Sequence, residues 1–326
     1  MSAAPPATLI LSRHDVAALM DPAAWLEAVE TGFRAAAEGK AEAPPPMAIE
    51  GVGGTFHAKG ASLALDRHYV ALKLNGNFPD NPAQGRPTIQ GGLMLCDGET
   101  GALLAIMDSI EITLRRTAAA SALAARYLAR SDSSRLLICG CGAQGLAHID
   151  ALRDVLPIRE ILTWDVDDEQ AQVFAGRTGG TAATDLAAAA LRSDVIVTCT
   201  TARAPFLDES CAAPGVFIAA VGADSPQKSE IAPELMARAK IVTDLTDQAA
   251  AMGDLHHAIA AGAMTADQVH AELAELVTGR KPGRAAATEI WLFDSTGTAL
   301  QDVAAAVTIH RRALALGSCR SVSLAA

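Results

Sequence analysis

The segment from residue 135 to 176 constrains the fold most, because a short apolar strand, a glycine-rich turn and a helix follow one another directly. Further short apolar runs continue this rhythm and are bounded by turn residues. We expect strands at 135–139, 160–164, 195–198, 216–221 and 241–243, with helices at 144–155 and 168–176. Alternating strands and helices predict an α/β fold, a Rossmann-type doubly wound parallel sheet with helices on both faces.

The turn itself, Gly140-Cys141-Gly142-Ala143-Gln144-Gly145, has the pattern G-x-G-x-x-G. Such glycines let the backbone turn tightly and approach a pyrophosphate, whose charge the helix N-terminus meets. Asp165 lies 20 residues past Gly145 at the end of the next strand, where its carboxylate would bind the adenosine ribose. Neither Val166 nor Asp167 offers a cation for a 2′-phosphate. The pattern therefore predicts NAD rather than NADP, and the alternative is a doubly wound domain without cofactor.

The chain ends have a different texture. A helix is expected at 21–40, with Asp21 as N-cap, Pro22 in its first turn and an apolar stripe of Trp25, Val29 and Phe33. Strands at 69–74, 88–96 and 103–107 predict a mostly antiparallel sheet, and a long helix at 110–129 leads to the polar connector 131–134. A strand at 289–293 and a helix at 298–316 follow. We expect an α+β domain of residues 1–130 with 298–326, and a dinucleotide-binding domain of residues 131–297.

Composition excludes several classes of protein. The 326 residues include 26 Lys and Arg against 37 Asp and Glu, a net charge of −11, which disfavours binding to nucleic acid or an anionic membrane. The apolar runs are too short for a membrane span, and residues 1–20 lack the pattern of an export signal. We expect a soluble cytoplasmic protein. Its six cysteines have no disulfide or zinc spacing and are expected to be reduced thiols.

Six motifs in order resemble the ornithine cyclodeaminase, alanine dehydrogenase and μ-crystallin family over about residues 20–315. The motifs are Lys73–Pro79, Gly85–Thr88, Arg116–Ala119, the glycine turn with Gln144, Val221–Glu230, and Phe293–Gly297 followed by Asp302. The resemblance implies a homodimer joined through the domain of both chain ends. It also implies an NAD(P)-dependent enzyme that acts at the α-carbon of an amino or imino acid.

The resemblance also implies roles for particular residues. Lys73 would bind the substrate carboxylate, Asp224 would be the essential acid/base, and Arg116 would lie between substrate and cofactor phosphate. With the glycine turn included, the implied cofactor contacts are Thr88, Arg116, Thr117, Gly140, Gly142, Ala143, Gln144, Asp165, Thr200, Val221, Gly222, Lys228 and Ser295.

The chemistry requires these residue types for its own reasons. Hydride leaves the Cα–H of an amino acid only when the amine is neutral, so a carboxylate such as Asp224 must take its proton. Asp224 follows an expected strand end, where open α/β sheets bind ligands, although an aspartate before Ser-Pro is also a common turn residue. Lys73 in an apolar strand is either an edge residue or a buried cation that needs an anionic partner. Of Arg115 and Arg116, only one can point to the site.

The sequence departs from the family pattern where many members carry an arginine that binds the substrate carboxylate. That place reads Pro45-Pro46-Met47. We hypothesise that Lys59, together with His57, replaces the arginine, and the alternative is that both are surface residues of a loop. His256 and His257 lie beside Asp254, but no third ligand is spaced to join them, so no metal site is predicted.

The leading functional hypothesis is an NAD-dependent amino acid dehydrogenase or ketimine reductase. The first alternative is an ornithine or lysine cyclodeaminase, which releases ammonia and recycles NAD internally. Such an enzyme needs a group for the distal amine, and His57 stands where the family has a carboxylate. The second alternative is a non-catalytic binding protein like the lens crystallin of the family, which lacks the aspartate that Asp224 supplies.

Overall fold

The computed structural model describes residues 7–324, and its internal contacts divide the chain into two compact units. One unit contains the residues up to Arg116 together with those from Thr298, and the other runs from Thr117 to Gly297. The division falls within the helix α3 (Ser109–Leu128) and not in the polar connector at 131–134. The helix is continuous through the division, so the connector lies wholly within the second unit. Residues 1–6 and 325–326 of the expected first domain lie outside the described residues.

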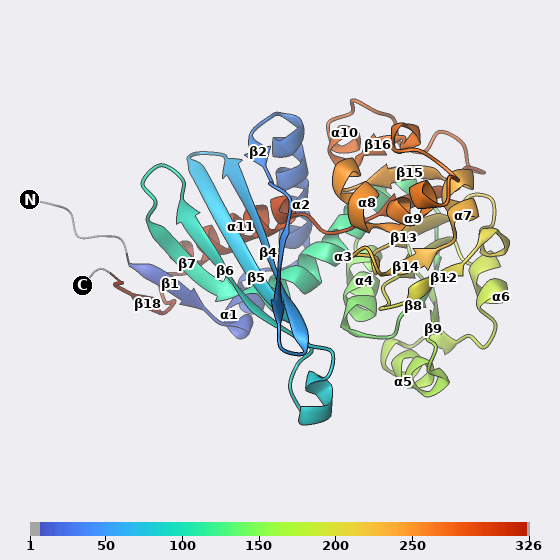
Figure 1. Ribbon diagram of the computed structural model, residues 1–326, viewed down its shortest axis with the longest axis horizontal. Helices are drawn as coiled ribbons and strands as arrows, with labels where there is room; N and C mark the ends of the chain where they lie inside the picture. The colour runs from blue at the N-terminus through green and yellow to red at the C-terminus, as the bar shows by residue number, and fades with distance from the viewer. Residues whose placement is uncertain (1–6, 325–326) are drawn as a thin grey trace, which may run out of the picture. The chain divides into compact units, whose positions relative to one another are not determined.

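The unit of both chain ends is built on an eight-stranded mixed sheet (Figure 1). Its strands are β1 (Thr8–Leu11), β2 (Ala41–Glu42), β3 (Met47–Gly51), β4 (Gly54–Ala64), β5 (His68–Asn77), β6 (Ile89–Asp97), β7 (Leu103–Asp108) and β18 (Ser321–Val322). All pairings are antiparallel except that of β1 with β7. The unit also contains α1 (Arg13–Leu19), α2 (Pro22–Ala37), the short η1 (Asn81–Gln84) and α11 (Ala299–Leu316).

Alternation along β5 gives this sheet one buried and one exposed face. Tyr69, Ala71 and Lys73 are buried, whereas the intervening apolar side chains are exposed. Helix α11 packs against β4, β5 and α2 on the buried face. The predicted Asp21 cap is present, because its Oδ1 accepts a hydrogen bond from Ala24 N at 2.9 Å. The hairpin of β3 and β4 was not predicted, because its glycine- and alanine-rich sequence has little apolar alternation.

The second unit contains an eight-stranded, wholly parallel sheet in the order β10-β9-β8-β11-β13-β17-β15-β16. The strands are β8 (Arg135–Cys139), β9 (Glu160–Trp164), β10 (Thr181–Ala182), β11 (Val195–Thr198), β13 (Phe217–Ala220), β15 (Lys240–Thr243), β16 (Ala271–Glu272) and β17 (Trp291–Asp294). A separate two-stranded sheet joins β12 (Arg203–Leu207) to β14 (Ser229–Ile231).

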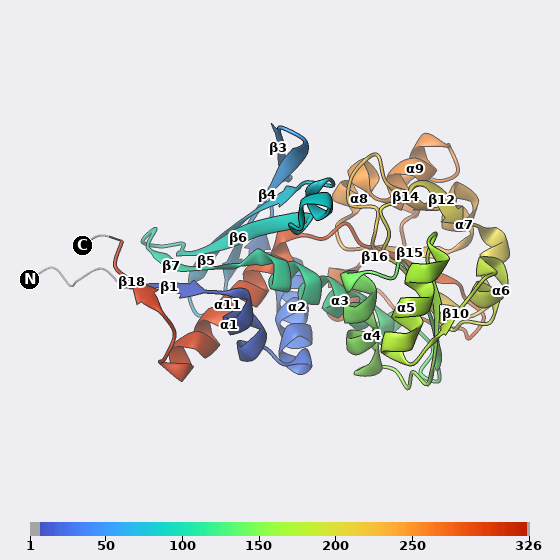
Figure 2. The same ribbon diagram turned by 90° about the horizontal axis from the view of Figure 1, so that it is seen from below.

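Helices cover both faces of the parallel sheet. Figure 2 shows α4 (Ala143–Arg153) and α5 (Asp168–Thr178) on one side, with α8 (Thr246–Met252) and α9 (Asp254–Ala260) on the other. The remaining helical segments are α6 (Leu186–Leu191), η2 (Glu209–Cys211), α7 (Pro233–Arg238), η3 (Ala266–Gln268) and α10 (Leu273–Val277). The strand order reverses between β8 and β11, which is where open α/β sheets form a ligand crevice.

Within residues 7–324, no helix combines the length and the apolar character needed to cross a membrane. All six cysteines lie in this range and carry free thiols.

Candidate active site

A buried charged cluster lies in the unit formed by the chain ends. Strand β5 directs Lys73 inward, α3 contributes Arg116, and the first turn of α11 contributes Asp302. Lys73 Nζ lies 2.7 Å from Asp302 Oδ2, and Arg116 Nε lies 3.0 Å from Asp302 Oδ1. Arg116 also donates through Nη1 to Gln301 Oε1 at 2.8 Å. The two cations share one carboxylate, so the trio carries an excess positive charge that suits an anionic ligand.

Burial controls protonation in this cluster. The side chains of Lys73, Arg116 and Asp302 are only 4%, 5% and 2% exposed. Burial lowers the pKa of Lys73 to about 7, Asp302 opposes this shift, and the neighbouring positive charges of Arg116 and Lys59 add to it. Burial by itself would raise the pKa of Asp302, but Lys73 and Arg116 hold it below its usual value.

Lys59 and His57 lie on the same face of the sheet as Lys73. Lys59 is directly opposite Lys73, and His57 is directly opposite Asn75, in the antiparallel register of β4 and β5. Both Lys59 and His57 are half-buried residues of strand β4 and do not lie in a surface loop. Arg115, by contrast, is 37% exposed and pairs with Glu111 at 3.0 Å. The structure therefore brings Lys59, Lys73 and Arg116 together and directs Arg115 elsewhere.

The glycine turn of the second unit has the shape that a pyrophosphate requires. Gly140 has φ +106°, and a Cβ there would lie 2.8 Å from the Cys199 carbonyl oxygen. A Cβ on Gly145 would lie 2.6 Å from the Gly140 carbonyl oxygen, so α4 can pack closely on the turn only with glycine. Gly142 faces open space and is the N-cap of α4 without a side-chain cap. The first N–H groups of α4 therefore remain available to an anion.

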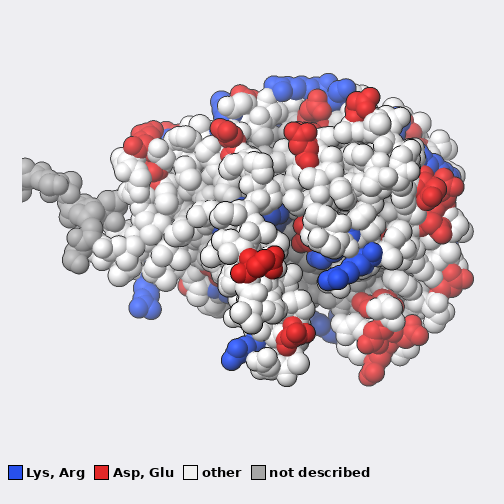
Figure 3. Space-filling model, in the orientation of Figure 1, with Lys and Arg blue, Asp and Glu red and all other residues white. Residues whose placement is uncertain are grey.

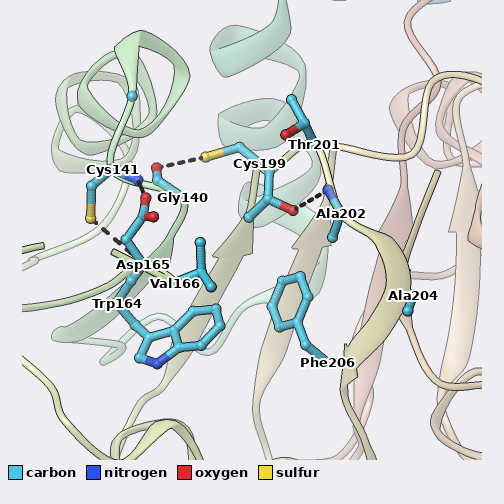
Figure 4. Close-up of a pocket in the computed structure, with 12 residues that line it drawn as sticks. Gly140, Cys141, Trp164, Asp165, Val166, Cys199, Thr201, Ala202, Ala204 and Phe206 are labelled. Atoms are coloured by element: carbon cyan, nitrogen blue, oxygen red, sulfur yellow. Dashed lines mark hydrogen bonds between the residues drawn. The ribbon is translucent and has the colours of Figure 1, made fainter. Parts of the chain in front are cut away.

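A cavity of about 460 Å³ lies beside this turn at the carboxyl ends of β8, β9 and β11 (Figure 4). Its volume is within the range of ligand sites. It is lined by Gly140, Cys141, Gly142, Trp164, Asp165, Val166, Cys199, Thr200, Thr201, Ala202, Ala204 and Phe206.

Asp165 is fixed on the wall of this cavity. Its Oδ2 accepts a hydrogen bond from Cys141 N at 2.8 Å, which ties β9 to the glycine turn, and Oδ1 accepts from Asp167 N at 3.2 Å. Trp164 and Phe206 stack with ring centroids 5.2 Å apart. A carboxylate between a glycine turn and an aromatic wall fits the adenosine end of a dinucleotide without a 2′-phosphate.

The other predicted cofactor contacts fall into two groups. Thr200, Val221, Gly222 and Ser295 follow the ends of β11, β13 and β17, while Ala143 and Gln144 form the first turn of α4. Thr117 is buried in α3. Thr88, before β6, and Arg116 belong to the other unit.

Asp224 lies in the loop between β13 and β14, and its Oδ1 is 2.6 Å from Lys228 Nζ. The Asp224 side chain is 54% exposed. His257 donates through Nε2 to the Lys228 carbonyl oxygen at 2.8 Å, so this histidine supports the same loop. Among the described residues, no group of three His, Cys, Asp or Glu side chains is arranged to hold a metal.

Sequence reasoning assigned no role to four buried carboxylates at the carboxyl edge of the parallel sheet: Glu230, Asp244, Asp254 and Asp294. Burial, and then the neighbouring Asp254, raises the pKa of Glu230 to about 7. Burial and Asp254 also raise the pKa of Asp294. Glu230 and Asp294 lie within the Val221–Glu230 and Phe293–Gly297 motifs, so an acidic residue inside an apolar motif was the available signal.

The doubly wound sheet, the glycine turn and the cavity define a dinucleotide-binding protein. Comparison with known proteins gives a family match over residues 7–317 to the "Ornithine cyclodeaminase/mu-crystallin family". The alanine dehydrogenase of Archaeoglobus fulgidus is 39% identical over 310 residues, which cover 94% of this chain and 95% of that protein. The chain belongs to the ornithine cyclodeaminase/mu-crystallin family.

Solved structures agree with this assignment. An archaeal alanine dehydrogenase dimer with bound NAD is 37% identical with a TM-score of 0.92, over 98% of this chain and 100% of that one. The Thermococcus litoralis Δ(1)-pyrroline-2-carboxylate reductase in complex with NADH and L-proline is 31% identical with a TM-score of 0.92, over 97% and 100%. The predicted family and α/β fold are confirmed, and the predicted cofactor agrees with these complexes.

The lowered pKa of Lys73 predicts a pH-dependent contribution to stability. Between pH 7 and about 10, the folded chain holds fewer protons on Lys73 than the unfolded chain, where the pKa is near 10.5. Stability then rises with pH, by at most about 1.4 kcal/mol per pH unit. We expect the difference in Tm, wild type minus Lys73→Met, to increase between pH 7 and pH 9 in buffered thermal scans. Parallel pH profiles of the two proteins would contradict the shift.

Proposed function

We propose that this protein is an NAD-dependent oxidoreductase that acts at the α-carbon of an L-amino acid or its imine, as an alanine dehydrogenase or a ketimine reductase does. The observation that carries the proposal is that two buried cations, Lys73 and Arg116, pair with one buried carboxylate, that of Asp302. The cluster therefore has an excess positive charge that can bind a substrate carboxylate. The relatives support the same chemistry, since one is named an alanine dehydrogenase and another is a reductase with NADH and L-proline bound.

In this mechanism the carboxylate of the substrate binds the Lys73 ammonium. Asp302 and Gln301 fix the orientation of the planar Arg116 guanidinium, whose remaining N–H donors suit a carboxylate or a phosphate. The pair with Asp302 also favours the charged form of Lys73 against the effect of burial. The cluster thus fixes one end of the substrate and orients its α-carbon.

NAD would be held by the glycine turn, Asp165, Thr200 and Gly222, and when bound it supplies the two-electron acceptor for the substrate Cα–H bond. Asp224 takes a proton from the substrate ammonium, because only a neutral amine can stabilise the developing imine. Lys228 Nζ fixes one oxygen of the Asp224 carboxylate at 2.6 Å. In the reverse direction the same carboxylate returns the proton.

Lys59 replaces the missing carboxylate-binding arginine in this proposal. Its position opposite Lys73 adds a second ammonium to the face that receives the substrate carboxylate. His57 lies one row further along the sheet, between Ala48 and Asn75.

That row favours net oxidation or reduction over cyclodeamination. A cyclodeaminase must place and deprotonate a distal amine, but the row of His57 contains no carboxylate. Glu50 of β3 lies at the far end of the same face and accepts a hydrogen bond from Thr55. The presence of Asp224 supports a working enzyme over a crystallin-like binding protein. Cyclodeamination is kept as an outcome of the assay below.

The exposed face of the first sheet is proposed to bind a second copy of the chain. Val70, Leu72 and Leu74 of β5 and Met94 of β6 expose apolar side chains on this face. Figure 3 shows few charged side chains over these strands. Contiguous exposed apolar surface of this kind marks an interface, and one similar solved structure is a dimer. We also propose a cytoplasmic location, as expected from the sequence.

The Asp224→Asn variant tests the proposed function. Purified protein is assayed with a panel of L-amino acids and cyclic imines while NADH absorbance and ammonia release are followed together. For the wild type we expect NADH and ammonia in equal amounts from an amino acid, or NADH consumption with an imine. Asp224→Asn should lose at least about 10²-fold in kcat, since a general acid/base contributes about that much, and should retain NADH affinity.

Other outcomes of this assay have defined meanings. Ammonia from ornithine or lysine without net NADH would replace the proposal by cyclodeamination. Asp224→Asn turnover close to that of the wild type would remove Asp224 from the mechanism.

The Lys59→Ala variant tests the replacement of the arginine. Loss of one charge-assisted contact is expected to raise the substrate KM about tenfold, with a smaller change in kcat, and Lys59→Arg should restore the KM. Lys40→Ala is the matched control, because Lys40 is an exposed lysine of the same unit that pairs with Glu38. An unchanged KM in Lys59→Ala would show that this lysine does not bind substrate.

The Leu72→Glu variant tests the proposed dimer. Leu72 is 43% exposed on the apolar face, and a buried charge there would oppose association. Light scattering after size exclusion should give twice the chain mass for the wild type and one chain mass for Leu72→Glu. Val173→Glu, at an exposed valine of α5, should remain dimeric. A monomeric wild type would contradict the proposal.

A further inference from the structure

We propose that Glu230 is a positioning residue for the cofactor: its carboxylate joins the ends of β11 and β13 and so holds Thr200 and Gly222 in the arrangement that binds NAD. The inference rests on the proposed NAD dependence and extends it to a residue that does not itself touch the cofactor.

The Glu230 carboxylate accepts four hydrogen bonds. Oε1 accepts from Thr200 N at 2.6 Å and from Thr200 Oγ1 at 2.7 Å. Oε2 accepts from Thr198 Oγ1 and from Gly222 N, both at 2.7 Å. Each oxygen has two donors directed at it, and an ionised carboxylate accepts all four hydrogen bonds. One side chain therefore connects two neighbouring strands where their backbone pairing ends.

The fit around this carboxylate is tight. Glu230 is fully buried, and a Cβ on Gly222 would lie 2.4 Å from Glu230 Cδ. Only glycine permits this approach, so any larger residue at position 222 would displace the Glu230 carboxylate.

Thr200 links Glu230 to the cavity. Its hydroxyl donates to Glu230 and accepts from Ala202 N at 3.1 Å, so its rotamer is fixed. Its methyl group then faces the glycine turn, since a Cβ on Gly140 would lie 3.1 Å from Thr200 Cγ2. Thr200 and Gly140 both line the cavity. The hydrogen bonds of Glu230 thus set the spacing between the end of β11 and the glycine turn.

Glu230 is itself held by further buried carboxylates. Glu230 N and Ile231 N donate to Asp254 Oδ1 at 2.8 and 3.0 Å, and Leu255 N donates to Asp294 Oδ2 at 2.8 Å. Glu230 and Ile231 belong to β14 and Leu255 to the first turn of α9, and these carboxylates are the partners that their buried N–H groups require. Asp254 thus holds the backbone of Glu230, and Asp294 holds the start of the helix that carries Asp254.

The test compares NADH affinity in Glu230→Gln with that in a matched control. Gln places an NH₂ group against N–H and O–H donors in a closed site, so we expect the Kd for NADH, measured by fluorescence titration, to rise at least tenfold. The KM for NADH should rise similarly, while kcat at saturating NADH stays within about threefold. Asp194→Asn is the control, because Asp194 binds Ser134 N and Arg135 N, at 2.9 and 3.0 Å, at the opposite edge of the same sheet.

The control separates positioning from simple stabilisation. Asp194→Asn should lower the Tm and leave the Kd for NADH within twofold of the wild type. Equal weakening of NADH binding in both variants, or unchanged binding in Glu230→Gln, would overturn the inference.

A milder pair of variants covers the case in which Glu230→Gln does not fold. Thr198→Val removes one donor to Oε2 and should weaken NADH binding about threefold or more, whereas Thr198→Ser keeps the donor and should bind as the wild type does. Equal affinity of Thr198→Val and Thr198→Ser would overturn the inference. A wild type that fails to bind NADH would instead refute the proposed function, so the two failures are distinguishable.

Discussion

The sharing of one buried carboxylate by two buried cations is the interaction on which the rest of the site depends. Asp302 lies 2.7 Å from Lys73 and 3.0 Å from Arg116, and none of the three side chains has much access to water. Without Asp302 the two positive charges would be buried together, at a cost of several kcal/mol per ion. With it, the cluster is stable enough to fold and still favours an additional anion, which in our account is the substrate carboxylate.

Carboxylates also organise the dinucleotide-binding unit, where they bind N–H groups at the strand ends. Asp194 does this at the amino edge of the parallel sheet, and Glu230 and Asp254 do it at the carboxyl edge. The carboxylates at the two edges of the sheet differ in their surroundings. Only the carboxyl edge borders the cavity, so only there does a structural hydrogen bond also set the geometry of ligand contacts.

Local patterns predicted much of the fold. The expected strands 135–139, 160–164 and 195–198 coincide with β8, β9 and β11, because short apolar runs between turn residues are distinctive. The hairpin of β3 and β4 lacked that pattern and was missed. The site was harder to predict, because Lys73 and Asp302 meet only after the chain ends pair in one unit. Glu230 was assigned no role for the same reason: its partners Thr198, Thr200 and Gly222 come from other strand ends.

A crystal structure of the protein with NAD and a 2-oxo acid bound together tests most directly whether the buried cations bind the substrate carboxylate. We expect a carboxylate oxygen of the ligand within hydrogen-bond distance of Lys73 Nζ, while Asp302 still pairs with Arg116. A ligand carboxylate bound by other groups, with Lys73 paired to Asp302 alone, would contradict this expectation.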